Sequence, residues 1–374
     1  MHLETFAMER YQSTWENIVD YNLSESGVHP FALNELLSAE QLAELSRIRL
    51  GYNQTNGTEA LRETIASLYP GANSSNILVT SGSAEANFLA IWYLLDSGDE
   101  MALMLPNYMQ IWGAARAFGA QVRPFHLIPV GDIWQLDSQE LKQAVTPKTR
   151  LVAVCHPNNP TGAQLSAAEM EMICQTAARV NAWILSDEVY RGAERIGDLT
   201  PTFWGQTDKV IITGGLSKAY GLAGLRIGWV VAPSEIIDHL WGYHDYTTIC
   251  VNPLSDHLAR LALSSPMRSQ IWQRSREIIG CNYAILQDWL QRFPGLFEWI
   301  PPAAGAIALV KYHAKLKSLD LVTQLRQQKS VLIVPGIHFL MENYLRFGFG
   351  SPANYLTSAL QRCTEFFSGL RGRA

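Results

Sequence analysis

Three polar side chains in the middle of the chain could act together on a carbonyl compound. Lys218 lies in the glycine-rich segment Gly-Leu-Ser-Lys-Ala-Tyr-Gly, Asp187 ends an apolar run, and Asn159 lies in the turn Pro-Asn-Asn-Pro-Thr-Gly. A lysine amine can bond covalently to an aldehyde, a carboxylate can pair with a protonated ring nitrogen, and an amide can donate to a ring oxygen. These residue types predict a site for an aromatic aldehyde cofactor.

A second group of residues could hold a phosphate. Ser81, Gly82 and Ser83 lie between an expected strand and an expected helix, where free backbone N–H groups and the helix dipole favour an anion. Arg226 would add a formal positive charge. An amine, a ring carboxylate and a phosphate cradle are what pyridoxal 5'-phosphate (PLP) requires, so the sequence predicts PLP as the cofactor and no metal.

These residues are spaced along an alternation of short β-rich runs and longer helical stretches. That alternation is typical of an α/β domain with a mostly parallel sheet and helices on both faces. Ligands of such sheets lie beyond the carboxyl ends of the strands, where Asn159, Asp187 and Lys218 are expected to lie. Strands are expected at residues 77–80, 101–105, 122–126, 151–155, 183–186, 210–213 and 227–232, and helices at 84–95 and 167–180.

The length and the C-terminal pattern indicate a second, smaller domain. A chain of 374 residues is too long for one compact core. Helical patterns at 235–246, 252–263 and 267–292 precede a mixed region with strands near 307–310, 331–334 and 344–349. We expect an N-terminal arm that packs with the small domain (1–45), a large PLP-binding domain (46–250) and a small C-terminal α+β domain (251–374).

Composition narrows the class of protein. The net charge of -5 offers no basic face for nucleic acid or an anionic membrane, and no apolar run approaches a membrane span. Acidic residues interrupt the first twenty positions, which disfavours a secretion signal. The five cysteines are scattered and form no CxxC pair, which favours reduced thiols. We therefore expect a cytoplasmic protein.

With these motifs in register, the chain resembles the fold type I PLP enzymes of the class I/II aminotransferase family over residues 52–346. The resemblance implies that Lys218 binds the cofactor covalently and later acts as the base at the substrate Cα. It implies that Asp187 pairs with the pyridinium nitrogen, and that Asn159 and Tyr190 donate to the ring oxygen. The plainer alternatives are a surface lysine, a turn-capping aspartate and a simple turn at Asn159.

The same resemblance assigns three more residues. Tyr52 would reach the phosphate of a neighbouring subunit, which implies a homodimer with shared sites. Tyr108 would stack on the cofactor ring, although it could equally be a core residue. Arg346 would bind the substrate α-carboxylate through its planar fork, with Asn159 beside it, so the substrate would be an α-amino acid.

One position departs from the family pattern. The family usually has Ser or Thr three residues before the lysine, where this chain has Gly215. Either a hydroxyl contact to the phosphate is missing, or Thr213 or a backbone N–H group replaces it.

The N-terminal segment suggests which reaction follows. Its pieces Glu-Arg-Tyr, beginning at Glu9, and Ser-Gly-Val-His, containing Gly27 and His29, resemble the arm of the hydroxyarginine cyclases, the branch that includes capreomycidine synthase. Glu9 could hold a guanidinium group by a two-point ion pair. A histidine ionises near neutral pH, so His29 could protonate a departing hydroxyl and later take a proton from the guanidine. Glu9 as a solvated helix residue and His29 as an ordinary loop residue remain the alternatives.

The resemblance implies loss of water from a hydroxylated L-arginine and addition of its guanidine to the resulting alkene. A 3-hydroxyl would give the six-membered ring of capreomycidine, and a 4-hydroxyl the five-membered ring of L-enduracididine. We favour the five-membered product slightly. The main alternative is an aminotransferase that passes the amino group to 2-oxoglutarate, which shares all the cofactor residues. A DNA-binding regulator is disfavoured, because only a short acidic segment precedes Tyr52.

Overall fold

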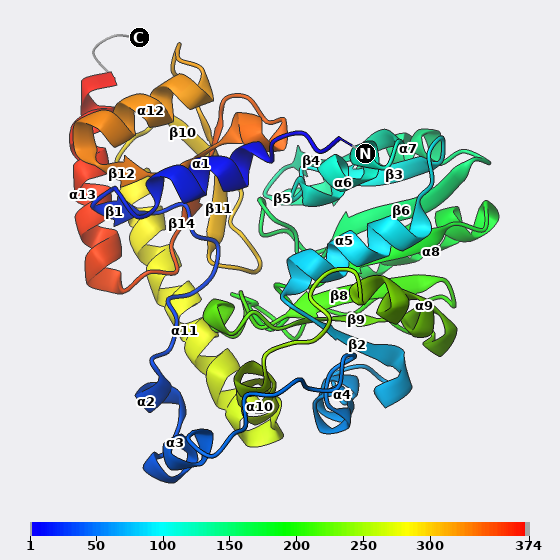
Figure 1. Cartoon of the computed structure of the whole chain (residues 1–374). Helices are drawn as coiled ribbons and strands as arrows, with labels where there is room; N and C mark the ends of the chain where they lie inside the picture. Colours follow the sequence, from blue (N-terminus) through cyan, green and yellow to red (C-terminus); the bar gives the residue numbers. More distant parts are fainter. Residues whose placement is uncertain (1, 371–374) are drawn as a thin grey trace.

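The computed structural model describes residues 2–370. Its centre is an eight-stranded sheet in the order β2-β9-β8-β7-β6-β3-β4-β5 (Figure 1). The pairs β3–β4, β3–β6, β6–β7 and β7–β8 are parallel, whereas β9 runs antiparallel to both of its neighbours. The strands are β2 (Ile77–Thr80), β3 (Glu100–Leu105), β4 (Gln121–Val130), β5 (Ile133–Leu136), β6 (Thr149–Cys155), β7 (Trp183–Asp187), β8 (Val210–Gly215) and β9 (Gly228–Val231).

Helices cover both faces of this sheet. Successive residues of a strand point to opposite faces, and the central strands carry apolar residues on both. One buried cluster joins Leu78, Leu103 and Leu185 to α5 (Ser83–Leu94), α6 (Gln110–Ala117) and α9 (Ser234–His244). The opposite face packs against α4 (Glu59–Ala66), α7 (Ser138–Ala144), α8 (Ala167–Arg179) and α10 (Pro253–Leu263). This is the expected α/β architecture with a mostly parallel sheet.

The C-terminal part forms a smaller unit around an antiparallel sheet in the order β10-β11-β14-β13. The long helix α11 (Ser265–Leu290) connects the two units, and α12 (Ser318–Lys329) and α13 (Ala353–Leu370) pack with the small sheet. The strands of this unit are β10 (Phe297–Trp299), β11 (Ile307–Tyr312), β12 (Val331–Leu332), β13 (Val334–Pro335) and β14 (Tyr344–Gly348). The expected α+β character of this region is present.

The N-terminal arm lies between the two units. Its strand β1 (Tyr21–Asn22) pairs in parallel with β12 of the small unit. Its helix α1 (Ala7–Trp15) packs Met8 against Val334 and Phe339. The segment before this helix reaches the large unit, where Glu4 forms an ion pair with Arg116 (Figure 1). Two short helices, α2 (Leu33–Leu36) and α3 (Ala39–Leu45), follow along the chain.

Some elements differ from the expectation. The expected strand at 331–334 is two short strands, β12 and β13, which pair in different sheets. The strand expected at 122–126 extends to Val130 and turns back into β5, which was not expected. Gly131 has a positive φ of 58° in the two-residue turn between β4 and β5, as tight hairpins require.

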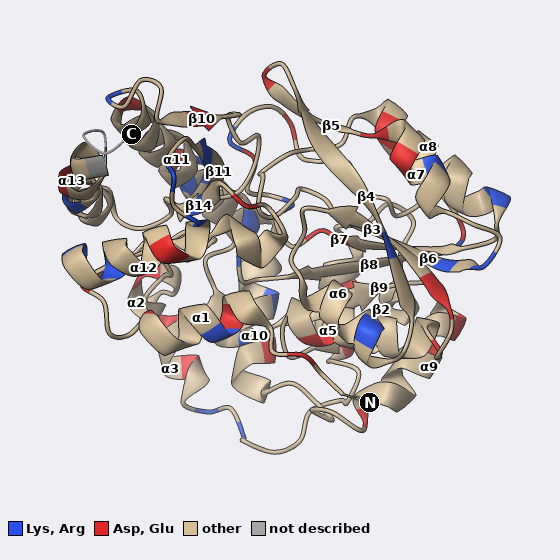
Figure 2. Ribbon diagram, turned by 90° about the horizontal axis from the view of Figure 1, so that it is seen from above, with Lys and Arg blue, Asp and Glu red and all other residues tan. Residues whose placement is uncertain are grey.

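The surface charge of the fold is mixed. Figure 2 shows acidic and basic positions interspersed on most elements, in keeping with a net charge of only -5. Within residues 2–370, no helix is long and apolar enough to cross a membrane.

Candidate active site

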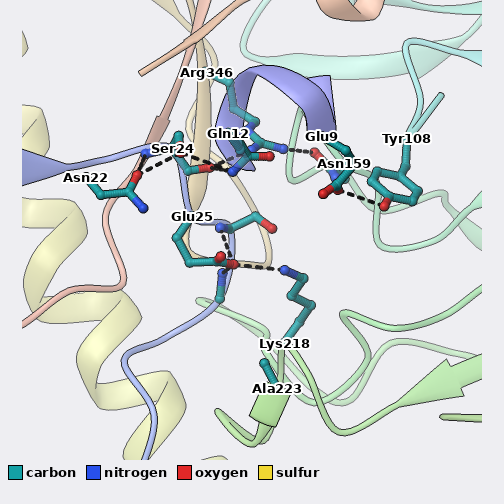
Figure 3. Close-up of polar contacts among 12 residues, drawn as sticks. Glu9, Gln12, Asn22, Ser24, Glu25, Tyr108, Asn159, Lys218, Ala223 and Arg346 are labelled. Carbon is teal, nitrogen blue, oxygen red and sulfur yellow. Dashed lines mark hydrogen bonds and ion pairs between the residues drawn. The ribbon is translucent and has the colours of Figure 1, made fainter. Parts of the chain in front are cut away.

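A cavity of about 380 Å³ lies between the carboxyl ends of the central strands and the N-terminal arm. The strand side includes Asn159, Asp187 and Lys218, and the arm contributes seven lining residues, three of which are carboxylates (Figure 3). The lining residues are Met8, Glu9, Gln12, Ser13, Glu16, Glu25, Ser26, Ser83, Ala84, Tyr108, Cys155, Asn159, Asp187, Val189, Tyr190, Ser217, Lys218, Ala223 and Arg226.

Lys218 lies in the loop after β8 and points into this cavity. Its Nζ is 2.9 Å from Oε1 of Glu25, a residue of the arm that the sequence analysis did not single out (Figure 3). The arm also contacts the lysine through Gly27, because a Cβ on Gly27 would lie 3.5 Å from Lys218 Cδ and 3.2 Å from the Ser217 carbonyl oxygen. Gly27 is therefore beside the lysine, although it does not line the cavity.

Asp187 is held by a chain of buried hydrogen bonds. Asn87 Nδ2 donates to its Oδ2 (2.9 Å), and the Val189 N–H donates to its Oδ1 (3.1 Å). Thr213 Oγ1 in turn donates to Asn87 Oδ1 (2.7 Å), which fixes the orientation of the amide. Burial raises the pKa of Asp187, while the hydrogen bond from Asn87 and the charge of Lys218 oppose that rise. A cationic partner in the cavity would stabilise the carboxylate further.

The hydrogen bonds from Thr213 through Asn87 to Asp187 decide whether Thr213 can supply the hydroxyl that is absent at Gly215. The Thr213 hydroxyl is fully buried and bonded to Asn87 behind the carboxylate, so it is not free to replace a phosphate contact. A Cβ on Gly215 would lie 3.1 Å from the Ile227 carbonyl oxygen and 3.5 Å from Ser83 Cβ, so space at this position is tight. Two alternatives therefore remain: the hydroxyl contact to the phosphate is missing, or a backbone N–H group replaces it.

The expected phosphate turn connects β2 to α5. Gly82 has a φ of 87°, which favours glycine, and a Cβ there would lie 2.3 Å from Arg226 Nη2, so a larger residue would displace this guanidinium group. The N–H groups of Ser81 and Gly82 already donate, to Glu85 Oε2 (2.6 Å) and to the Thr80 carbonyl oxygen (2.9 Å). Two of the three N–H groups that we expected to be free therefore have partners, and Ser83 is the one residue of the three that lines the cavity.

Asn159 lines the cavity, and Arg346 lies directly behind it without lining the cavity itself. Arg346 is 1% exposed; its Nη1 donates to Asn159 Oδ1 (2.9 Å) and its Nη2 to the Ser24 carbonyl oxygen (2.6 Å) (Figure 3). Its Nε is buried and has no partner among the described residues. Burial lowers the pKa of Arg346, so a carboxylate bound here would be strongly favoured.

Tyr108 and Glu9 join the large unit to the arm. The Tyr108 hydroxyl donates to Glu9 Oε1 (2.8 Å), and its ring contacts the edge of Phe6 at 5.0 Å between centroids. Burial and the neighbouring Glu9 raise the pKa of Tyr108, which keeps the phenol protonated as a donor. Glu9 lies on α1; it is exposed and lines the cavity.

Two predicted site residues lie apart from this group. His29 does not line the cavity, and its Nδ1 is 3.0 Å from the Gly350 carbonyl oxygen. Tyr52 is 89% exposed and is not among the residues that line the cavity. A site shared with a second subunit would suit this position of Tyr52.

The cavity fits the cofactor that the motifs imply. The Tyr190 hydroxyl is buried, lines the cavity and has no hydrogen-bond partner among residues 2–370, so a ligand oxygen could fill that need. Asp187 and Lys218 face the same space, with Arg226 at the phosphate turn. Asp187 would pair with the ring nitrogen of the cofactor, Lys218 would bond to its aldehyde carbon, and Arg226 would bind its phosphate.

Residues 20–362 match the family model for aminotransferase class I and II. The chain belongs to this family. It is 29% identical to capreomycidine synthase of Streptomyces vinaceus, over 97% of this chain and 92% of that protein. A PLP-dependent aminotransferase from Streptococcus suis 89-1591 is 32% identical, with a TM-score of 0.92 over 99% of both chains. The PLP-dependent cyclase OrfR is 27% identical, with a TM-score of 0.89 over 100% of this chain and 99% of that one.

These relationships confirm the fold, the family and the cofactor that the sequence predicted. The protein is a PLP-dependent enzyme of the aminotransferase superfamily, and its cofactor is pyridoxal 5'-phosphate. Among its relatives are an aminotransferase, capreomycidine synthase and a PLP-dependent cyclase, so membership of the family does not define the reaction.

Proposed function

We propose that this enzyme cyclises a hydroxylated L-arginine by loss of water and intramolecular addition of the guanidine. The product would be a cyclic guanidino amino acid, L-enduracididine from the 4-hydroxy substrate or capreomycidine from the 3-hydroxy substrate. One observation carries the proposal: the arm places the carboxylates of Glu9, Glu16 and Glu25 along one side of the cavity, which suits a cationic side chain.

The other end of the substrate would be held by the buried arginine. Arg346 would bind the α-carboxylate, with Asn159 fixing the plane of its guanidinium group. Bound PLP supplies an electron sink that makes the Cα proton acidic. Lys218, once displaced from the cofactor, would take that proton, and Asp187 would keep the ring nitrogen charged.

The side-chain end would be held by the arm. Burial and the neighbouring Glu25 and Glu9 carboxylates raise the pKa of Glu16, which reflects repulsion among like charges. A guanidinium group placed between these carboxylates would relieve that repulsion. Tyr108 would hold Glu9 in position for a two-point ion pair. His29 would protonate the departing hydroxyl and later accept a proton from the guanidine, a role for which its side chain would have to turn from Gly350 toward the substrate.

An aminotransferase remains the second candidate, because the relative from Streptococcus suis carries that name and the cofactor residues serve both reactions. Its usual acceptor, 2-oxoglutarate, brings a second carboxylate into the site. Arg346, beside the cavity, would bind one of its carboxylates, but among the described lining residues the only cations are Lys218 and Arg226, which the cofactor would occupy. The carboxylates of the arm would repel the acceptor, so the cavity favours the cyclase.

We also propose a homodimer with shared sites. Leu50, Tyr52, Tyr246 and Ile249 are exposed apolar side chains, of which Tyr52 is the residue expected to reach the neighbouring phosphate. The division into arm, large domain and small domain at residues 45 and 250 stays part of this proposal. All five cysteines are free, and the cytoplasmic location that they led us to expect also remains a prediction.

The test is a reaction of the purified, PLP-loaded protein with 3-hydroxy-L-arginine and 4-hydroxy-L-arginine, without any oxoacid. Mass spectrometry and NMR would identify the product. We expect a product lighter by one water that keeps its α-amino group and contains no alkene, and its ring size would identify the substrate. Formation of glutamate only after 2-oxoglutarate is added would instead establish the aminotransferase.

A further inference from the structure

The contact between Glu25 and Lys218 assigns the arm a role at the reacting nitrogen. Glu25 Oε1 lies 2.9 Å from Lys218 Nζ, and the same oxygen accepts from the N–H groups of Ser26 (2.9 Å) and Gly27 (3.3 Å). The backbone of the arm therefore fixes the carboxylate that faces the lysine. Glu9 and Glu16 line the same cavity, but no hydrogen bond or ion pair joins either of them to Lys218 in the described structure.

The charges around Nζ come from four elements. Glu25 approaches from the arm, Tyr190 from the loop after β7, Asp187 from the end of β7, and Arg346 from β14. Burial lowers the pKa of Lys218, but the charge and hydrogen bond of Glu25, together with Tyr190, outweigh it, and the pKa lies above its ordinary value. The neighbouring lysine holds the pKa of Glu25 down to about 2, so the proton of the pair lies on the nitrogen.

We propose that Glu25 is a positioning residue that acts through Lys218 by holding a proton on Nζ. When Lys218 takes the Cα proton, the electron pair of the Cα–H bond stays with the substrate, and Glu25 retains the proton on the lysine instead of releasing it to solvent. After the guanidine has added, the same proton returns to Cα. The inference rests on the proposed role of Lys218 as the cofactor lysine, which the cyclase and the aminotransferase share.

This role would suit a reaction that ends with an intact α-amino acid. The cyclase removes a proton from Cα and must replace it there. The departing hydroxyl takes up a proton that the guanidine later releases, and a 4-hydroxy substrate must also lose and regain a proton at Cβ. A base that keeps the Cα proton close by can return it to Cα without drawing a proton from solvent. Glu25 gives Lys218 this property, because a negative charge at hydrogen-bond distance stabilises the ammonium form.

The test uses Glu25→Gln, which keeps the shape of the side chain and removes its charge. In the PLP-loaded protein, the absorbance of the bound cofactor changes with pH as the nitrogen that joins it to Lys218 loses its proton. The variant should lower the midpoint of that change by about 1 pH unit or more, as loss of an opposite charge at this distance implies. Glu25→Asp keeps the charge on a shorter chain and should shift the midpoint less.

A second measurement needs no turnover and no substrate. The full-length chain freed of cofactor is mixed with PLP at neutral pH, and covalent loading is followed by absorbance. Only the neutral amine reacts, so Glu25→Gln should load faster, by about tenfold for each pH unit that the pKa of Lys218 falls. A substitution that only disordered the arm would slow loading or leave it unchanged. The matched control is Glu16→Gln, a carboxylate of the same cavity without contact to Lys218.

The outcomes separate this inference from the proposed function. An unchanged midpoint and an unchanged loading rate in Glu25→Gln would overturn the inference and leave the cofactor role of Lys218 intact. Equal shifts in Glu25→Gln and Glu16→Gln would also overturn it, because the effect would then come from the general charge of the cavity. If Lys218→Ala kept the covalent absorbance band, the role of Lys218 and the inference would both fail.

Discussion

The two sides of the cavity are built in different ways. On the sheet side, Asp187, Asn87 and Thr213 are buried at strand ends or on a covering helix and are joined by hydrogen bonds within the protein. On the arm side, Glu25 has a side chain that is 53% exposed, and Glu9 is likewise exposed. The sheet side can hold a cofactor in one geometry, whereas the arm side can vary with the substrate.

This difference indicates which residues could change the substrate specificity of such an enzyme. The sheet side contacts a core that packs both faces of an eight-stranded sheet, so a substitution there affects folding as well as chemistry. The arm contacts the rest of the protein along its length, for example through β1 with β12, Ser24 with Arg346 and Glu4 with Arg116, but its cavity carboxylates Glu9 and Glu25 are exposed. Substitutions of these two carboxylates should therefore alter substrate choice while the fold is kept.

The largest effect is expected from Lys218→Ala on the sheet side. The variant should lose the covalent cofactor band and more than about a thousandfold of its turnover, because no other lysine lines the cavity among the described residues. Absorbance and product formation would be measured together. Retained turnover above a hundredth of the wild-type rate would contradict the assignment of the base.

Arg346→Lys should have the next largest effect. The charge remains, but the planar fork that binds Asn159 and would bind a carboxylate is lost, so kcat/KM should fall by about 10- to 100-fold. Most of the loss should appear in KM, and the cofactor absorbance should not change. A change confined to kcat would place Arg346 in the chemical step and not in carboxylate binding.

Thr213→Val removes the outermost member of the buried chain behind Asp187. The variant leaves Asn87 Oδ1 buried without its donor, which should lower the free energy of unfolding by about 1–3 kcal/mol. Urea unfolding of the cofactor-free chain measures this loss, and Thr213→Ser, which keeps the hydroxyl, is the control. Equal stability of Val and Ser variants would show that the hydroxyl does not support Asp187.

The sheet side was largely predictable from the sequence, whereas on the arm side the sequence singled out Glu9 but not Glu25. Lys218, Asp187 and Asn159 lie at strand ends, where the motif spacing and the α/β pattern expected them, and they meet in one cavity. The partner of Lys218 could not be inferred, because Glu25 approaches through β1, a strand of two residues that pairs with a segment far along the chain. Its only signal was a position next to the Ser-Gly-Val-His segment.

Other differences have the same physical origin. Asn87 could have been noticed as a polar residue within the apolar helix pattern after Ser83, but its two partners come from distant strands. The reversed direction of β9 depends on tertiary pairing with β2 and β8, which local alternation does not encode. His29 was singled out by a short motif, and the structure directs its ring to Gly350.

A smaller effect is expected at the junction between the two sides. Tyr108→Phe removes the donor that holds Glu9, so KM for the hydroxyarginine should rise about fivefold with little change in kcat. Glu9→Gln should raise KM more, because it also removes the charge. In the double variant the effects should not add, since both substitutions act through one carboxylate. Additive effects would mean that Tyr108 acts on the cofactor ring independently of Glu9.

The smallest effect concerns the pH dependence of the arm contact. The pKa of Glu25 is lowered from 4.5 to about 2 by Lys218, so the pair stabilises the fold above pH 4.5 and loses that contribution as the pH falls toward 2. Because the Glu25 side chain is about half exposed, this contribution should be below about 1 kcal/mol. The free energies of unfolding of the cofactor-free wild type and Glu25→Gln, measured in urea, should differ above pH 4.5 and converge as the pH falls toward 2. A difference that persisted at the lowest pH would mean that Glu25 stabilises the arm through its backbone hydrogen bonds and not through its charge.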